Sequence, residues 1–368
     1  MSLPQLDIHL DIIRENAATV RKLCGEYGIE VTGITKAFTA QPQIVQAFLD
    51  AGISRLGDSR TQNLKNLENV QAEKWLIRMP MLSEIDETVT YADVSLNSEL
   101  ATIKALDHAA GRLGRTHKII LMADLGDLRE GYVDDKELLR AAEEITKLRH
   151  VKLYGVGTNL SCFSFIRPDR EKMSQLQALA ARLPLEGPPI ISGGNSATLH
   201  LMMERGLSGG INNLRLGESL LFGRERCCYS FLQGTRRDAF LLSAEVIELK
   251  EKPSLPWGEV GTDSYGRYPP KPTDRGIRKK AILALGKQDC DSETMQPVDR
   301  GIQLLGASSD HMMLDVTDSQ RDYRVGDWVE FELGYHSLMR AFTSKYVQKT
   351  YCELQPNAKS KELAMAAR

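Results

Sequence analysis

The chain has 368 residues, of which 42% are hydrophobic, and its 47 basic and 49 acidic side chains leave a formal net charge of −2. This length suits one large domain with a smaller companion, because an α/β barrel alone runs to about 250 residues. The balanced charge gives no indication of nucleic acid or an anionic membrane as a partner. The longest apolar runs are also shorter than the about 20 residues that span a bilayer.

The N-terminus and the cysteines indicate the compartment. No basic segment followed by an apolar one opens the chain, so no secretory signal is expected. The six cysteines are scattered and form no C-x-x-C pair. That pattern is typical of reduced thiols rather than of a disulfide framework or a metal site. We therefore expect a cytoplasmic protein without a bound metal.

Short β-like runs alternate with longer helical stretches through the first part of the chain. Amphipathic segments such as 98–114 and 136–149 have apolar residues at helical spacing. Eight β-like runs are recognised: 30–36, 54–58, 75–80, 93–97, 117–125, 151–159, 188–195 and 211–217. Eight strand-helix repeats predict a (β/α)8 TIM barrel over residues 11–230 rather than an open doubly wound sheet.

The pattern changes after Phe222. The remaining runs are β-like, are separated by turns rich in Pro and Gly, and show little helical periodicity. They predict a mainly β domain over residues 231–352. The N-terminal segment 4–10 is also strand-like and is expected to join that domain.

Several predicted barrel strands end in residues with useful chemistry. They are Lys36, Asp58, Asn97, Arg129, Asn159, Asn195 with Ser196, and Arg215. In a barrel the carboxyl ends of the strands form the active-site face, so these side chains are expected to converge. Turns also favour Asn and Asp for conformational reasons, and we favour that explanation for Asp58 and Asn97.

Lys36 follows the first barrel strand, in "GITKA". A lysine there can act as a nucleophile towards carbonyl groups if its pKa is lowered, although an isolated lysine more often packs its stem and leaves its amine in water. The turn "SGGNSA" puts main-chain N–H groups and the Ser196 hydroxyl at a helix start, which suits a phosphate as well as an ordinary helix cap. Arg215 and Gly217 follow the last strand. Pyridoxal 5′-phosphate and a sugar phosphate both fit this pattern.

Taken together, these motifs resemble the barrel-type pyridoxal-phosphate enzymes of the alanine racemase family, and most closely their ornithine racemase-like branch. The resemblance implies that Lys36 holds the cofactor. It also implies that Arg215 faces the pyridine nitrogen and that Arg129, in "DLGDLREG", holds the substrate carboxylate. The remaining cofactor contacts that it implies are Asn159, Asn195, Ser196, Gly217, Glu218 and Tyr335, with Ser309 at the substrate.

The chain departs from the family pattern at two places. Asn159 replaces the histidine that stacks on the cofactor ring. Racemisation usually needs two bases, and the family's second base is a tyrosine supplied by the partner subunit. The corresponding stretch here, "ILALGKQDCD", has no tyrosine and offers Lys287, which an ordinary surface role would equally explain. Candidates for the second base are Lys287, Asp310 and His311, with Tyr265 a remoter one.

These expectations define a leading function and several alternatives. The leading prediction is a pyridoxal-phosphate-dependent racemase of ornithine or a related basic amino acid, working as a homodimer with shared active sites. An alanine racemase is one alternative. Another is an amino-acid decarboxylase of the same fold, which "QDCDSE" around Cys290 weakly suggests. A non-catalytic pyridoxal-phosphate carrier is less favoured, because the chain continues far beyond the barrel.

Overall fold

The computed structural model describes residues 3–185, 187–207, 210–262, 266, 268 and 273–353. These divide into two compact units. One contains residues 9–239 with 352–353, and the other contains residues 3–8 with 240–351. None of the described helices has the length and apolar character needed to cross a membrane.

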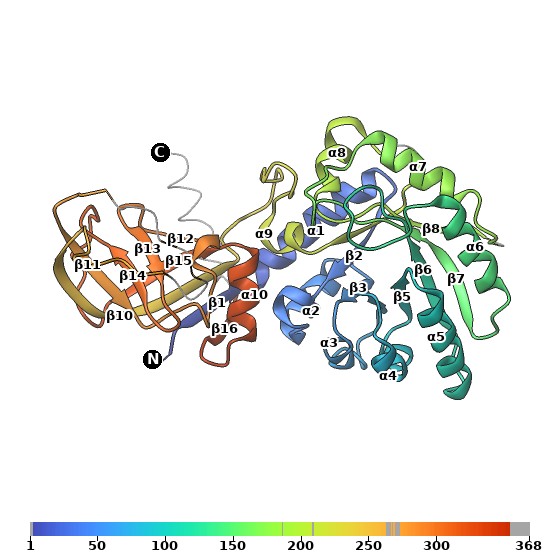
Figure 1. Ribbon diagram of the computed structural model, residues 1–368, viewed down its shortest axis with the longest axis horizontal. Helices are drawn as coiled ribbons and strands as arrows, with labels where there is room; N and C mark the ends of the chain where they lie inside the picture. Colours follow the sequence, from blue (N-terminus) through green and yellow to red (C-terminus); the bar gives the residue numbers. More distant parts are fainter. Residues whose placement is uncertain are drawn as a thin grey trace. The chain divides into compact units, whose positions relative to one another are not determined.

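The first unit is a closed barrel of eight parallel strands (Figure 1). In order these are β2 (Glu30–Ile34), β3 (Arg55–Asp58), β4 (Glu73–Leu76), β5 (Val94–Asn97), β6 (His117–Met122), β7 (Val151–Gly157), β8 (Ile190–Ser192) and β9 (Asn213–Leu216). Strand β9 pairs in parallel with β2 and closes the ring. The predicted TIM barrel is confirmed.

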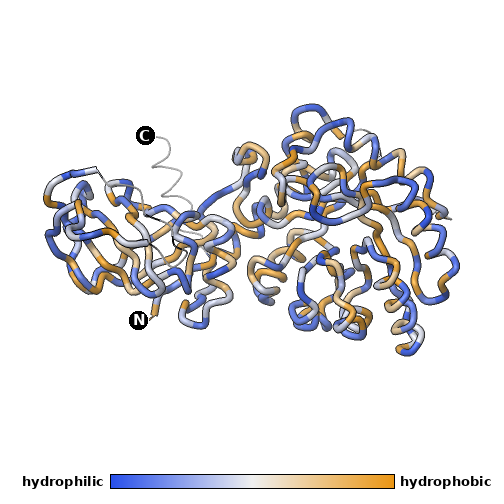
Figure 2. Tube along the Cα trace, in the orientation of Figure 1, coloured by the Kyte–Doolittle hydropathy of each residue, from blue (hydrophilic) through white to orange (hydrophobic). Residues whose placement is uncertain are grey.

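Helices follow the strands and surround the barrel (Figure 1). They are α1 (Leu10–Glu26), α2 (Pro42–Asp50), α3 (Thr61–Lys65), α4 (Ile85–Tyr91), α5 (Leu100–Arg112), α6 (Asp135–Thr146), α7 (Arg170–Ala180), α8 (Thr198–Arg205) and α9 (Glu218–Phe222). The 3-10 turns η1 (Lys36–Phe38) and η2 (Leu82–Glu84) lie between them. Along these helices the chain changes repeatedly between hydrophobic and hydrophilic (Figure 2), as expected for helices with one face on a core.

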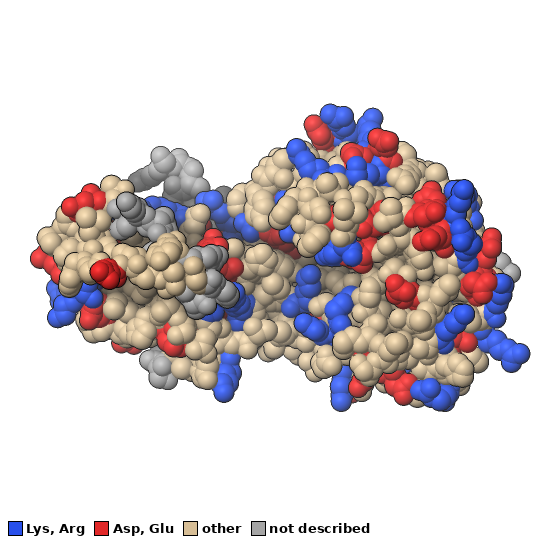
Figure 3. All heavy atoms as spheres, in the orientation of Figure 1, with Lys and Arg blue, Asp and Glu red and all other residues tan. Residues whose placement is uncertain are grey.

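Side-chain alternation along the strands builds two apolar layers. On β6, Ile119 and Leu121 join a core cluster with residues of the outer helices. Their neighbours Ile120 and Met122 join Trp75 in a cluster whose fully buried members all lie on strands. Successive side chains of a strand point to opposite faces, so the second cluster fills the barrel interior. Charged residues of both signs are interspersed over the visible barrel surface (Figure 3).

The second unit is a mainly antiparallel β-sheet, as predicted. Its strands are β1 (Gln5–His9), β10 (Phe240–Pro253), β11 (Ile277–Leu283), β12 (Met295–Pro297), β13 (Gln303–Ala307), β14 (Met312–Asp315), β15 (Trp328–Leu333) and β16 (Gln348–Cys352). They run in the order β12-β15-β10-β11-β14-β13, and β1 pairs with both β10 and β16. The unit also has η3 (Ser292–Thr294) and helix α10 (Tyr335–Thr343).

Candidate active site

Lys36 lies at the carboxyl end of a barrel strand. Strand β2 ends at Ile34, and Lys36 begins the η1 turn. The preceding residue, Thr35, donates from its hydroxyl to Asp58 Oδ2 at 2.6 Å. Asp58 is fully buried at the end of β3 and also accepts hydrogen bonds from Arg60 N and Asn63 Nδ2. This network fixes the backbone from which the Lys36 side chain projects.

The surroundings of Lys36 favour its neutral amine. Water reaches the side chain, yet protein atoms surround it closely enough that burial lowers its pKa. The nearby sulfur of Cys162 raises the pKa, whereas the cations Arg129 and Arg226 lower it, and Asp58 raises it. Burial dominates, so the pKa of Lys36 lies below its usual 10.5.

Burial also acts on Asp58, the carboxylate nearest this strand end. Desolvation raises the pKa of Asp58, while the hydrogen bonds from Thr35 and Asn63 act in the opposite direction. In the hydrogen bonds described above, the Asp58 carboxyl acts as an acceptor. The sequence favoured a turn role for this residue. Its contacts with Arg60 and Asn63 are local to that turn, whereas its contact with Thr35 reaches the loop after β2.

Two serines join the loops after β8 and β9. Ser196 precedes α8, and its Oγ lies 3.1 Å from Ser219 Oγ and accepts from Ser219 N at 3.3 Å. Both serines are buried. Gly217 lies against strand β2, where an added Cβ would stand 3.3 Å from Ile34 Cβ. The two predicted phosphate turns, with Glu218 at the start of α9, thus lie beside the strand that leads to Lys36.

Asn195 connects the loop after β7 to the loop after β8. Its Nδ2 donates to Leu160 O at 2.8 Å and to Asn159 Oδ1 at 3.1 Å, while its Oδ1 accepts from Ala197 N at 2.8 Å. Within the described residues, Asn159 Nδ2 and Thr158 Oγ1 are buried atoms without a hydrogen-bond partner. Buried polar atoms of this kind are rare unless a ligand or water completes them.

Arg215 is held rigidly at the end of β9. Its Nη1 donates to Ser192 Oγ at 2.6 Å, and its Nη2 donates to Thr158 O at 2.7 Å. Ser192 continues this polar network through Asn213 to Thr32 inside the barrel. Burial lowers the pKa of Arg215 to about 10, so the guanidinium remains charged at neutral pH.

Arg129 lies in the loop after β6 and forms an ion pair with its neighbour Glu130. The buried carboxylate of Asp127, in the same loop, accepts hydrogen bonds from the main-chain N–H groups of Cys162 and Phe163 at 3.2 and 3.0 Å. This contact ties the loop after β6 to the loop after β7. It brings Arg129 and Cys162 to the same part of the barrel as Lys36.

Two side chains in this region escaped the sequence analysis. Cys162 Sγ accepts from Asn195 Nδ2 at 3.3 Å and from Arg226 Nη1 at 3.4 Å. Both Cys162 and Arg226 affect the pKa of Lys36. Cys162 lies three residues after Asn159 in the same loop, and this closeness in sequence to a predicted site residue could have identified it. Arg226 lies beyond the last barrel strand, and no local pattern distinguishes it.

The predicted second-base residues gather in the β unit. Lys287 N donates to Ser308 O at 2.9 Å, and Gln288 donates from N to Ser309 O and from Nε2 to Asp310 Oδ1. Gly286 approaches the turn so closely that an added Cβ would stand 2.0 Å from Ser309 O. Four predicted residues thus form one exposed cluster, here called the β-unit loop cluster: Lys287, Ser309, Asp310 and His311.

Two predicted tyrosines have different outcomes. Tyr335, which the resemblance implies as a cofactor contact, begins helix α10 just after strand β15 ends at Leu333. Its ring packs edge-on against His336, with centroids 6.3 Å apart. Tyr265 lies outside the described residues.

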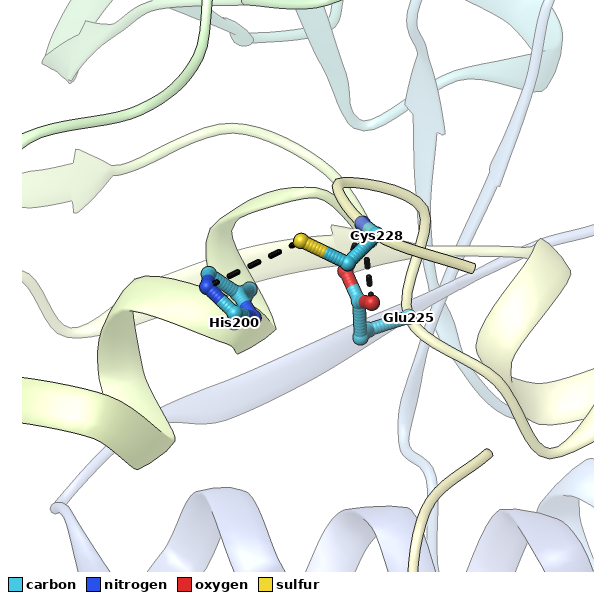
Figure 4. Close-up of side chains that lie close together, drawn as sticks. All are labelled: His200, Glu225 and Cys228. Carbon is cyan, nitrogen blue, oxygen red and sulfur yellow. Dashed lines mark hydrogen bonds between the residues drawn. The ribbon is translucent and has the colours of Figure 1, made fainter. Parts of the chain in front are cut away.

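A separate cluster of possible metal ligands lies near α8 (Figure 4). His200, Glu225 and Cys228 place their ligand atoms within 4.8 Å of one another. The Glu225 carboxylate, however, already accepts main-chain N–H groups of Cys227, Cys228 and Ser230. Arg167 also donates to the Cys228 sulfur at 3.1 Å, placing a positive charge where a cation would bind. These contacts stabilise the loop and already occupy the Glu225 carboxylate and the Cys228 sulfur, which disfavours metal binding.

Comparison with known proteins gives matches over nearly the whole chain. The family described as "Alanine racemase, N-terminal domain" matches residues 8–225. The ornithine racemase of Acetoanaerobium sticklandii is 43% identical over 349 residues, 94% of this chain and 99% of that protein. The lysine racemase of Thermotoga maritima is 40% identical over 356 residues, 95% of this chain and 99% of that protein.

Solved structures share the fold at lower identity. An alanine racemase of Clostridium difficile superposes with a TM-score of 0.72 at 19% identity, covering 95% of this chain and 96% of that one. The alanine racemase of Bartonella henselae, solved with covalently bound pyridoxal phosphate, gives a TM-score of 0.71 at 17% identity, covering 96% of this chain and all of that one.

Proposed function

Because this chain belongs to the alanine racemase family, we propose that it uses pyridoxal 5′-phosphate to racemise ornithine or a related basic amino acid. Its isomerase class follows from the racemases that are 40–43% identical to it. The cofactor, the substrate and the roles of individual side chains form the proposal.

The residues at the barrel mouth fit this cofactor. Lys36 offers an accessible amine with a lowered pKa, and Ser196 and Ser219 offer paired hydroxyls beside the Gly217 turn. Asn159 Nδ2 is a buried donor that has no partner among the described residues. Pyridoxal phosphate, when bound, supplies an electron sink that makes the α-proton of an amino acid removable.

The observation that carries the proposal is the environment of Lys36. Burial, Arg129 and Arg226 all act to lower its pKa, which increases the share of neutral amine. A neutral Nζ can hold the cofactor and can accept or return a proton at one face of the α-carbon. Arg215 keeps its protons at neutral pH, so it would give none to a ring nitrogen that faces it.

The second base is proposed to come from the β-unit loop cluster of a partner subunit. Racemisation needs proton transfer on the opposite face of the α-carbon, and Lys287, Asp310 and His311 lie together in one exposed cluster as candidate bases. This proposal requires a homodimer in which the active sites are shared between the subunits. A protein that sediments as a monomer while fully active would contradict it.

Specific observations disfavour the alternatives. Cys290, the residue that hinted at a decarboxylase, is fully buried, and burial raises its pKa to about 12, which does not suit a reactive thiol. Relatives named for ornithine and lysine favour a basic substrate over alanine. The β unit that follows the barrel along the chain disfavours a simple cofactor carrier. All six cysteines are free, in keeping with a reducing cytoplasm.

The proposal is tested by replacing Lys36 and by varying the substrate. Wild-type protein is expected to absorb at about 420 nm through the cofactor held on Lys36. Lys36→Ala should lose this band and about 10⁴-fold or more of activity, whereas the exposed Lys22→Ala serves as the matched control. Wild-type protein should racemise enantiopure ornithine and lysine faster than alanine. A yellow, fully active Lys36→Ala protein would refute the anchor, and fastest turnover of alanine would refute the substrate.

A further inference from the structure

The site contains one arginine more than the cofactor and substrate roles above require. Arg226 is half-buried, and among the described residues its guanidinium makes a single hydrogen bond, to the Cys162 sulfur at 3.4 Å. A guanidinium has five N–H donors, and a thiol is a weak acceptor. Partly buried donors left in this state are costly unless a stronger acceptor completes them.

Nearby carboxylates do not meet this need. Glu218 accepts from Arg224 Nε at 2.9 Å and forms an ion pair with its Nη2 at 2.8 Å. Glu225 is fully buried, and its carboxylate accepts the main-chain N–H groups that hold the loop. Among the described residues neither acid forms a hydrogen bond with Arg226, although the charge of Glu218 raises the Arg226 pKa.

A main-chain contact places the backbone of Arg226 beside the turn after β8. Its main-chain N–H donates to Ser196 O at 3.3 Å, so the residue is tied to the predicted phosphate turn. The two cysteines that follow have their sulfurs on Arg167, at 3.0 Å for Cys227 and 3.1 Å for Cys228. Glu225 thus anchors a loop in which Arg226 donates to the Cys162 sulfur. The sulfurs of the next two residues, Cys227 and Cys228, accept from Arg167.

We propose that Arg226 binds an oxyanion in the active site, either the phosphate of the cofactor or the α-carboxylate of the amino acid. This inference rests on the proposed function, since it takes the barrel mouth as the site for both groups. Arg226 lies close enough to Lys36 to lower its pKa, and so does Arg129. The two arginines thereby provide two separate positive charges near the reactive amine, one for the cofactor phosphate and one for the substrate α-carboxylate. Guanidinium groups bind both kinds of oxyanion through paired hydrogen bonds.

The test measures oxyanion binding directly on the full-length chain after the cofactor has been removed. Inorganic phosphate and 5-aminopentanoate, which carries a carboxylate and a distal amine but no α-amine, are titrated by calorimetry. Arg226→Gln is expected to weaken one probe by about tenfold, because it removes charge-assisted hydrogen bonds. Arg226→Lys should retain part of the affinity. Arg167→Gln is the matched control, because its guanidinium contacts the same loop on Cys227 and Cys228.

Each outcome has a defined meaning. Selective loss of phosphate binding assigns Arg226 to the cofactor, and selective loss of 5-aminopentanoate binding assigns it to the substrate carboxylate. Unchanged binding of both probes would overturn the proposal, as would an equal loss in Arg167→Gln or a wild-type protein that binds neither probe. Absorbance of the Lys36→Ala protein tests the proposed function separately, so that either idea can fail alone.

Discussion

The barrel mouth and the β-unit loop cluster are built by different means. At the barrel mouth, hydrogen bonds between side chains fix the site residues in place. Arg215 is fixed by Ser192, and Thr35 is fixed by Asp58, in both cases through buried hydrogen bonds of 2.6 Å. The β-unit loop cluster is exposed, and the main chain holds it together, through Lys287 N to Ser308 O and the close approach of Gly286.

This difference matches the tasks proposed for the two regions. A preorganised, buried set of charges can shift the pKa of a lysine, because low-dielectric surroundings strengthen electrostatic effects. An exposed cluster on a rigid backbone leaves its side chains available to another subunit. The barrel mouth should therefore be sensitive to changes of side-chain chemistry, and the β-unit loop cluster to changes of backbone shape.

After the replacement of Lys36, the largest expected effect concerns the second base. Lys287→Ala or His311→Ala should slow α-proton exchange from one enantiomer by about 10²–10⁴-fold, the usual contribution of a general base, and leave exchange from the other enantiomer much less affected. The measurement is deuterium incorporation from each enantiomer separately. Equal loss for both enantiomers in both variants would place the base elsewhere, and the absorbance at about 420 nm should remain in either case.

A pH experiment probes the buried side chains of the barrel. His117 begins β6 with Nε2 2.7 Å from Ser95 Oγ, and burial lowers its pKa from 6.5 to about 4. Between these values the unfolded chain binds a proton that the folded chain does not. The free energy of unfolding should therefore fall as the pH drops from 6.5 to about 4, by about 3 kcal/mol in total.

Urea denaturation at several pH values measures this dependence. His117→Gln cannot take up the proton and should flatten the decline, and His108→Gln, at an exposed position on α5, serves as the matched control. An identical pH dependence in wild type and His117→Gln would show that other groups govern acid stability.

A smaller effect is expected from the backbone of the β-unit loop cluster. In Gly286→Ala the new Cβ would meet Ser309 O at 2.0 Å, and a main-chain atom cannot move away cheaply. The free energy of unfolding should fall by about 1–3 kcal/mol, while Gly261→Ala, with no atom within 4 Å, serves as the control. Racemase activity should fall with retained cofactor absorbance. If Gly286→Ala displaces the loop but leaves racemase activity unchanged, the β-unit loop cluster takes no part in catalysis.

The sequence alone determined the barrel, the β unit and the strand-end positions of Lys36, Ser196 and Arg215. These features depend on local periodicity and on the rule that parallel strands present their carboxyl ends together. Asn97 shows where that reasoning stops. It ends β5 as expected, but its amide donates to Ser95 Oγ of the same strand at 2.8 Å. Leu96, which lies between Ser95 and Asn97, is the residue that joins the cluster inside the barrel.

Only the tertiary structure revealed the contacts between loops. Cys162 meets Asn195 across 33 residues and Arg226 across 64, and closure of the barrel between β9 and β2 brings those loops near Lys36. No pattern of neighbouring residues encodes such separations. The pKa of Lys36 was likewise beyond the sequence, because burial and the summed effect of distant charges set it.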